Sequence, residues 1–220
     1  MPDLTLVIGN RNYSSWSLRA WILVQHLGLP CREIRIALDT PTSAAELGRY
    51  SPTRRVPVLI DGAMAVWEST AIFEYLNELK DGAGWPAERQ ARATARAVTA
   101  EMHAGFAALR AAYPMNIRAR DRRVPPTAGL SDAIARIDAL WTDCRERFGA
   151  AGPWLFGAYS AADAMYLPVA FRFQTYGLEG LGASARGYVA TAVGDPLVAP
   201  WVRAAAQEPE TIEHEEVGRR

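Results

Sequence analysis

Three short segments in the first third of the chain carry groups that could hold a small charged molecule. They are the pair Ser14-Ser15, the dipeptide Val56-Pro57 and the dipeptide Glu68-Ser69. Hydroxyl groups at a helix start can donate to an anion, which the helix dipole also favours. We expect Ser69 to be the N-cap of a helix. A cis Val56-Pro57 bond would leave the Val56 backbone free for a ligand. A backbone edge beside an anion-binding helix start suits a small peptide.

The two serines lack the partners that a nucleophile needs. The sequence places no histidine or acid as a base for Ser14 or Ser15, and it contains no Gly-x-Ser-x-Gly turn. A serine here is suited to stabilising the thiolate of another molecule through a hydrogen bond. The structural alternative is that one of these serines only caps the following helix.

Alternating strand and helix patterns must position these segments. The predicted elements are a strand over 4–8, a helix over 16–27, a strand over 34–38, a helical turn over 44–47 and a helix after Ser69. Apolar runs on both sides of Asp61-Gly62 predict a β-hairpin between the helical turn and the helix after Ser69. The order predicts a parallel βαβ unit, then a hairpin and a covering helix.

Strand patterns vanish in the second part of the chain. We predict a first domain over 1–80, a linker over 81–87 and an all-helical domain over 88–220, because the linker is rich in glycine. Helices are expected over 88–112, 131–148, 160–173, 183–193 and 198–207. Ser160 and Asp163 have the spacing of a capping box, and the charged tail after Glu208 is expected to fray.

Composition narrows the function classes. The 220 residues are 50% hydrophobic, and 24 basic side chains balance 24 acidic ones. This balance gives no support for binding nucleic acid or an anionic membrane surface. No apolar run is long enough to span a bilayer, and no metal site is expected. Cys31 and Cys144 form no Cys-x-x-Cys pair, which is typical of a reduced cytoplasmic protein with buried thiols.

Four motifs in order resemble those of the cytosolic glutathione transferases, over nearly the whole chain. Residues 14–19 (Ser-Ser-Trp-Ser-Leu-Arg) are similar to the Ser-Ser-Cys-x-x-Arg signature of the serine-type zeta class. Residues 52–57 (Pro-Thr-Arg-Arg-Val-Pro) resemble the family's Pro-x-x-Lys-Val-Pro segment before its cis-proline. Glu68-Ser69 matches the family's Glu-Ser pair, and residues 160–163 match its capping box. Each motif is weak alone, but four at the right spacing are specific.

The resemblance implies an α/β thioredoxin-like N-terminal domain plus an all-α C-terminal domain. It implies that the chain binds glutathione as a co-substrate and presents its thiolate to a small apolar electrophile. Ser14 would hydrogen-bond the sulfur, with Ser15 as second candidate. Residues implied to hold glutathione are Trp16, Arg55, Val56, Pro57, Glu68 and Ser69. Those implied to line the electrophile pocket are Met102, His103, Phe106 and Arg110. The family also implies a cytoplasmic homodimer.

Departures from the family pattern leave other functions open. Trp16 stands where the zeta signature has cysteine, which argues against cysteine-linked redox chemistry and against zeta-type isomerase chemistry. Ser51 precedes Pro52 where the family has Asn-Pro. A glutathione-dependent cis-trans isomerase of zeta type would use the same site on another substrate. A non-catalytic interaction module is the remaining alternative, because a fold does not fix a function.

Overall fold

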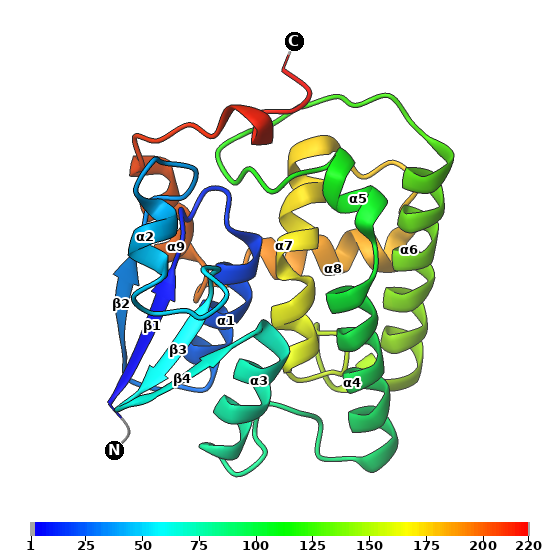
Figure 1. Cartoon of the computed structure of the whole chain (residues 1–220). Coiled ribbons are helices and arrows are strands. Elements are labelled where there is room, and N and C mark those ends of the chain that lie inside the picture. The colour runs from blue at the N-terminus through cyan, green and yellow to red at the C-terminus, as the bar shows by residue number, and fades with distance from the viewer. Residues whose placement is uncertain (1–2, 220) are drawn as a thin grey trace.

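The computed structural model describes residues 3–219, in which a four-stranded sheet is followed by helices (Figure 1). The first elements alternate as the sequence predicts. They are β1 (Leu4–Ile8), α1 (Ser15–His26), β2 (Cys31–Arg35), α2 (Ser43–Leu47), β3 (Val58–Asp61), β4 (Met64–Trp67) and α3 (Ser69–Glu78).

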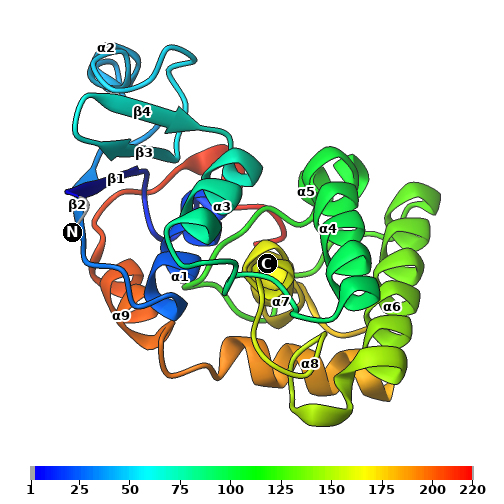
Figure 2. The ribbon, with the colours of Figure 1, turned by 90° about the horizontal axis from the view of Figure 1, so that it is seen from below.

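The sheet has the strand order β2-β1-β3-β4. β1 is parallel to β2, whereas β3 is antiparallel to both β1 and β4. Figure 2 shows α2 on one side of the sheet and α1 and α3 on the other. Leu4, Leu6 and Ile8 of β1 join the main core, and Val7 points to the opposite cluster under α2. This arrangement confirms the expected thioredoxin-like α/β unit.

The hairpin turns where Asp61-Gly62 predicts it. Asp61 pairs with Met64, so Gly62 and Ala63 alone form the connection. Gly62 has a φ of 58°, a left-handed backbone that glycine adopts without steric cost. The tight turn fixes the register and therefore the point at which the chain leaves β4 for α3.

The second strand lies three residues earlier than predicted. β2 pairs with β1 from Leu4↔Cys31 to Ile8↔Arg35, and it ends where β1 ends. The alternating sequence pattern continues to Leu38, but β1, the strand beside it, ends at Ile8. Beyond that point, the amide of Leu38 donates instead to Asn10 Oδ1 at 2.7 Å. The end of β2 is therefore set by the length over which it pairs with β1, which the alternating pattern does not encode.

The remaining elements are helical, as the sequence predicts. They are α4 (Arg89–Ala104), α5 (Ala107–Ala112), α6 (Ala128–Phe148), α7 (Ala161–Tyr176), α8 (Ala183–Val193) and α9 (Ala199–Gln207), with short 3-10 turns at Gly149–Ala151 and Glu213–Glu215. No helix within residues 3–219 is both long and apolar enough to cross a membrane.

The helix expected over 88–112 is broken into α4 and α5. Gly105 ends α4 with an extended backbone, and Phe106 follows in the left-handed conformation with a φ of 59°. A Cβ at position 105 would lie 2.7 Å from the carbonyl oxygen of Glu101, so the bend requires glycine there. The apolar spacing continues through the break and conceals it.

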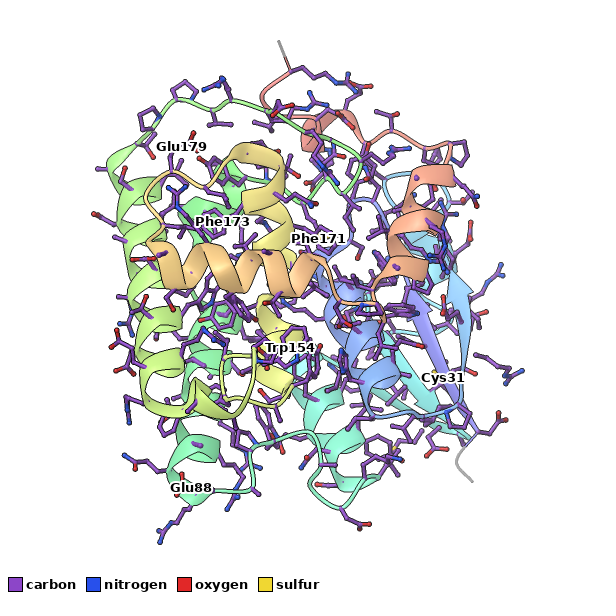
Figure 3. All side chains as sticks on the ribbon, turned by 180° about the vertical axis from the view of Figure 1, so that it is seen from behind. Cys31, Glu88, Trp154, Phe171, Phe173 and Glu179 are labelled. Carbon is purple, nitrogen blue, oxygen red and sulfur yellow. The ribbon has the colours of Figure 1, made fainter. Side chains whose placement is uncertain are left out.

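Helix α7 is the centre of the helical region. Nearly all its residues are buried, and it packs on α1, α4 and α8 (Figure 2). Figure 3 shows Phe171 and Phe173 of α7 beside α8. The predicted capping box is confirmed, because the Asp163 carboxylate accepts from the backbone amide of Ser160 at 2.8 Å. One apolar core therefore runs from the sheet through α7 to the outer helices.

The C-terminal tail is held in place, which contradicts the expectation that it frays. The Glu208 carboxylate accepts from the backbone amides of Arg11 at 2.8 Å and Asn12 at 3.1 Å. The Arg118 guanidinium donates to the carbonyl of Glu208 at 2.5 Å and to that of Glu210 at 2.9 Å. In Figure 1 the tail, coloured red, crosses the top of the molecule from α9 past α7. The tail is also held by ion pairs with distant arginines, since Glu208 and Glu210 pair with Arg35 and Glu216 pairs with Arg122.

Candidate functional site

All six residues that the sequence assigns to a peptide ligand line one cavity of about 180 Å³. We call it the hairpin cavity because it lies beside the segment that enters the β3–β4 hairpin. The six are Trp16, Arg55, Val56, Pro57, Glu68 and Ser69, and they are joined there by Thr53, Trp67, His103 and Arg110. Residues from the start of α1, the loop before β3, the junction of β4 with α3, and from α4 and α5 thus converge on one hollow.

The Val56–Pro57 peptide bond is cis, the form that would leave the Val56 backbone free for a ligand. Within residues 3–219, neither the amide nor the carbonyl of Val56 takes part in a hydrogen bond. Val58 then begins β3 and pairs with Val7 and Trp67. Both polar backbone groups of Val56 are therefore available where the sheet meets the cavity.

The start of α3 differs by one residue from the prediction. Ser69 is the first helical residue and Glu68 is the N-cap, with a φ of 69°. The Ser69 hydroxyl therefore does not cap the helix. It lies 3.3 Å from Nδ1 of His103, and Glu68 Oε2 lies 3.7 Å from Nε2 of the same ring. Ser69 lines the hairpin cavity, so the first turn of α3, whose amides have no partner within the helix, begins beside it.

His103 joins the Glu68-Ser69 pair, a neighbour that its place in the sequence does not predict. Burial lowers the pKa of His103, and the charges of Arg19 and Arg110 lower it further, whereas Glu68 acts in the opposite direction. In its neutral form the imidazole can donate through one ring nitrogen and accept through the other.

The two serines of the first turn occupy different positions. Ser14 is the N-cap of α1, because its hydroxyl accepts from the amide of Ser17 at 3.4 Å and lies 2.8 Å from the Ser17 hydroxyl. Ser15 is the first helical residue, and its hydroxyl accepts from Nη2 of Arg172 at 3.3 Å. The capping alternative thus describes Ser14. Both side chains also line a second cavity.

This second cavity, of about 450 Å³, adjoins the first and shares Trp16, Arg55, Val56 and Arg110 with it. We call it the arginine cavity. Its charged lining consists of four arginines and one acid: Arg54, Arg55, Arg110, Arg172 and Glu215. Leu38, Leu47, Pro114 and Met115 supply apolar walls. An excess of positive charge beside apolar surface distinguishes this cavity.

Trp16 forms the partition between the two cavities. The Arg19 guanidinium lies 4.2 Å from its ring centre, and that of Arg110 lies at 5.5 Å. The His103 ring meets it edge to face at 5.3 Å. Cations over an aromatic face are attracted by the ring quadrupole, so Trp16 is held by its neighbours.

Of the four residues expected in an electrophile pocket, two line a cavity. His103 lines the hairpin cavity, and Arg110 lines both cavities. Met102 is fully buried in the core, and Phe106 lies half-buried at the break between α4 and α5. Helical spacing does not distinguish these outcomes, because the break turns the chain between Met102 and Arg110.

Sequence reasoning missed Arg172 and Glu215. A signal for Arg172 was present, since only Asp163 and Arg172 carry charge in the otherwise apolar α7, and a capping box accounts for Asp163. Glu215 lies in a charged tail with no local pattern that singles it out. Its place opposite Arg172 depends on how the tail crosses the molecule.

The first part of the chain matches a known protein family. Residues 13–79 match the family model described as "Glutathione S-transferase, N-terminal domain". A dichloromethane dehalogenase of Methylorubrum extorquens is 58% identical over 36 residues, which are 16% of this chain and 12% of that protein. The same enzyme of Methylophilus leisingeri is 54% identical over 33 residues, 15% of this chain and 12% of that protein. These matches span a small part of the relatives' length.

Solved structures of similar shape extend over nearly the whole chain. A glutathione transferase homologue from Burkholderia with bound glutathione has a TM-score of 0.69 and 22% identity, covering 93% of this chain and 98% of that one. A tau class glutathione S-transferase from Mangifera indica has a TM-score of 0.71 and 18% identity, covering 97% of this chain and 96% of that one. A theta class glutathione S-transferase from Xanthomonas axonopodis with glutathione bound has a TM-score of 0.64 and 21% identity, covering 96% of this chain and 100% of that one. The chain therefore has the glutathione transferase fold.

Proposed function

We propose that this chain, which has the glutathione transferase fold, is a glutathione transferase that binds the tripeptide in the hairpin cavity. One observation carries the proposal: the six side chains and backbone segments predicted for glutathione line one hollow at the start of α1 and α3. The family-model match, over residues 13–79, includes all six. Similar structures with bound glutathione lend further support.

The chemistry of the cavity walls suits each part of glutathione. The free amide and carbonyl of Val56 can pair with the cysteinyl backbone as an added strand would. Glu68 can meet the γ-glutamyl ammonium group, and Ser69 with the first turn of α3 can meet the adjoining carboxylate. Arg55 is exposed and can reach the glycyl carboxylate. This orientation directs the sulfur toward the start of α1.

The reaction would depend on making and holding a thiolate. A serine hydroxyl and the dipole of α1 both favour the charged sulfur, so the thiol proton is released to solvent. The sulfur then forms a bond to an electrophilic carbon in the adjoining cavity, and the leaving group departs with its electron pair. Holding both partners side by side lowers the barrier by proximity.

The thiol pKa of bound glutathione tests which serine contributes. Thiolate absorbance should be titrated in the wild type, Ser14→Ala and Ser15→Ala. Loss of one hydrogen bond to a charged group costs about 1.5–3 kcal/mol, so the responsible variant should raise the thiol pKa by about one to two pH units. Ser14→Ala should also lower stability by about 1 kcal/mol, because it removes the cap of α1. An unchanged thiol pKa in both single variants and in the double variant would overturn thiolate stabilisation by this turn.

Retention on immobilised glutathione separates an enzyme from a non-catalytic module. We expect the folded protein to be retained and to be eluted by free glutathione. Folded protein that passes through unretained would favour the module. A matched pair of variants, Glu68→Ala in the cavity and Glu74→Ala on the exposed face of α3, shows whether retention depends on the hairpin cavity.

We also propose a homodimer that uses the edge of the sheet. Met64 and Trp67 of β4 are exposed by 44% and 42%, which is high for large apolar side chains. Trp67 also lines the hairpin cavity, so a second copy on β4 would lie beside the bound tripeptide. Light scattering measures the oligomeric state of the wild type and of Trp67→Ser. A monomeric wild type would contradict this part of the proposal.

A further inference from the structure

Arg172 is a buried cation with free donor groups at the wall of the arginine cavity. Its side chain is 3% exposed. Nε donates to the carbonyl of Tyr113 at 2.7 Å, and Nη2 donates to the Ser15 hydroxyl at 3.3 Å. Nη1 has no hydrogen-bond partner among residues 3–219. A donor that is buried without a partner costs free energy, so such a group invites a ligand.

Arg19 and Arg110 extend the positive charge around Trp16. Arg19 is fully buried behind the indole, with only Nε bonded, to the carbonyl of Met165 at 2.9 Å. Both of its terminal nitrogens lack partners within the described part of the chain. Arg110, on the other side, donates from Nη1 to the carbonyl of His103 at 3.3 Å and lines both cavities. Arg19 and Arg110 thus lie at the Trp16 ring, and Arg172 lies at the adjoining Ser15 hydroxyl.

Two partly buried arginines elsewhere in the chain are paired with acids. Arg35 meets Glu208 at 2.7 Å, and Arg122 meets Glu216 at 2.7 Å. By contrast, none of Arg19, Arg110 and Arg172 forms an ion pair with an acid of residues 3–219. Removing a guanidinium from water without a counter-charge costs several kcal/mol. The buried Arg19 and Arg172, with the partly buried Arg110 beside them, therefore point to an anion supplied from outside.

We propose that the second substrate carries a carboxylate, which Arg172 and Arg110 bind in the arginine cavity. This inference rests on the proposed function and replaces the uncharged electrophile expected from the sequence. Leu38, Leu47 and Met115 would hold the carbon skeleton. Because Nη2 of Arg172 lies beside the Ser15 hydroxyl, the bound carboxylate anchors the electrophilic carbon near the sulfur.

The carboxylates of glutathione itself are less suitable occupants. Arg55 and the first turn of α3 already offer them partners in the hairpin cavity. The cavity's own acid, Glu215, comes from the tail and does not form an ion pair with Arg172 within the described residues. It is one acid among four arginines, so the charged lining stays positive. Guanidinium groups present planar paired donors, which match a carboxylate.

A matched pair of electrophiles tests the inference on the unaltered protein. We would compare 4-(bromomethyl)benzoate with its methyl ester. In each case the sulfur bonds to the benzylic carbon, bromide leaves with the electron pair and the thiol proton passes to solvent. After subtraction of the uncatalysed rate, kcat/KM should be about 10-fold to 100-fold higher for the acid, since a charged hydrogen-bonded pair contributes that much. Equal values, or a faster ester, would overturn the inference.

Arginine variants then identify the anchor. In Arg172→Met the ratio of kcat/KM for acid over ester should fall toward one, and Arg172→Lys should restore part of it. Arg145→Met is the matched control, because Arg145 also donates to backbone carbonyls but lies outside both cavities. If Arg172→Met does not fold, Arg110→Met should lower the same ratio. An unchanged ratio in the variant that folds would overturn the role of the arginines.

Two further measurements separate this inference from the proposed function. If Arg172→Met lowers the rates of acid and ester equally and raises the thiol pKa, then Arg172 serves the thiolate and the carboxylate assignment is wrong. Glutathione affinity, measured by calorimetry without electrophile, reports on the proposed function alone. Protein that binds glutathione but does not distinguish acid from ester contradicts only the further inference. Protein that does not bind glutathione contradicts the proposed function.

Discussion

The hairpin cavity and the arginine cavity lie side by side but are assembled differently. The first takes most of its lining from residues 53–69, and it carries charges of both signs on Arg55, Glu68 and Arg110. The second combines residues 13–16, 38–56, 110–115, 172 and 215, and its lining is positive except for Glu215. The hairpin cavity therefore depends mainly on one local segment, whereas the arginine cavity depends on how distant segments pack together.

The shared wall explains how the two cavities can act together. Trp16 contributes to both, and Arg19, Arg110 and His103 pack around its ring. The start of α1, with Ser14 and Ser15, opens into the arginine cavity. Under the proposed function, the sulfur would lie where the two cavities meet. Affinity for the tripeptide and selectivity for the second substrate should then be separable by mutation.

The largest expected effect concerns the helix that carries Arg172. Asp163→Ala should lower the free energy of unfolding by about 3 kcal/mol, because the buried carboxylate accepts from the amides of Leu155 and Ser160 and from the Ser160 hydroxyl. Urea unfolding measures the change. Asp143→Ala on the exposed face of α6 is the control, with an expected cost below about 0.5 kcal/mol. Similar costs for both would contradict the role of the capping box.

The second effect should fall on the hairpin cavity alone. Glu68→Ala should weaken glutathione binding by about 10-fold to 100-fold, because it removes the acid expected to meet the ammonium group. Calorimetry measures the affinity. At saturating glutathione, the acid-to-ester ratio of kcat/KM should stay within about twofold of the wild type. A ratio that changes with Glu68 would show that the two cavities are not independent.

The smallest effect is a pH dependence of selectivity. Burial raises the pKa of Glu215, with the charges of His214 and Arg172 acting against it. As pH falls through this raised pKa, Glu215 becomes neutral and ceases to repel a substrate carboxylate. The acid-to-ester ratio of kcat/KM should therefore rise by about 2-fold to 5-fold, consistent with one partly screened charge pair.

Glu215→Gln provides the decisive comparison for this last effect. The variant should show the high ratio at all pH values, because glutamine carries no charge to titrate. Thiolate formation affects acid and ester alike, so it cancels from the ratio. A wild type and variant with the same pH profile would show that Glu215 does not act on the arginine cavity.

Much of the hairpin cavity could be predicted because its signals are local. A proline before a strand, an Asp-Gly turn and a helix start follow one another within 14 residues of sequence, from Val56 to Ser69. Their backbone preferences act over a few residues, so spacing alone brings them together. The one-residue error at Ser69 arises because Glu68 takes the cap position with a left-handed φ of 69°.

The arginine cavity could not be predicted in the same way. Periodicity shows which residues share a helix face, but it does not show what that face meets. Ser15 and Arg172 are 157 residues apart, and their contact depends on the packing of α7 against α1. The break at Gly105 and Phe106 likewise brings Arg110 to the cavities while Met102 stays in the core.

The sequence by itself determined the order of strands and helices, the hairpin and the set of residues around Val56-Pro57 and Glu68-Ser69. These features follow from local backbone preferences and from patterns of buried side chains. Only the tertiary structure decided that Arg19 and Arg172 would be buried without an ion-paired acid, and that Arg110 and Glu215 would line the same cavity as Arg172. The physical reason is that a charge counts as unpaired only after packing has fixed every group within its reach.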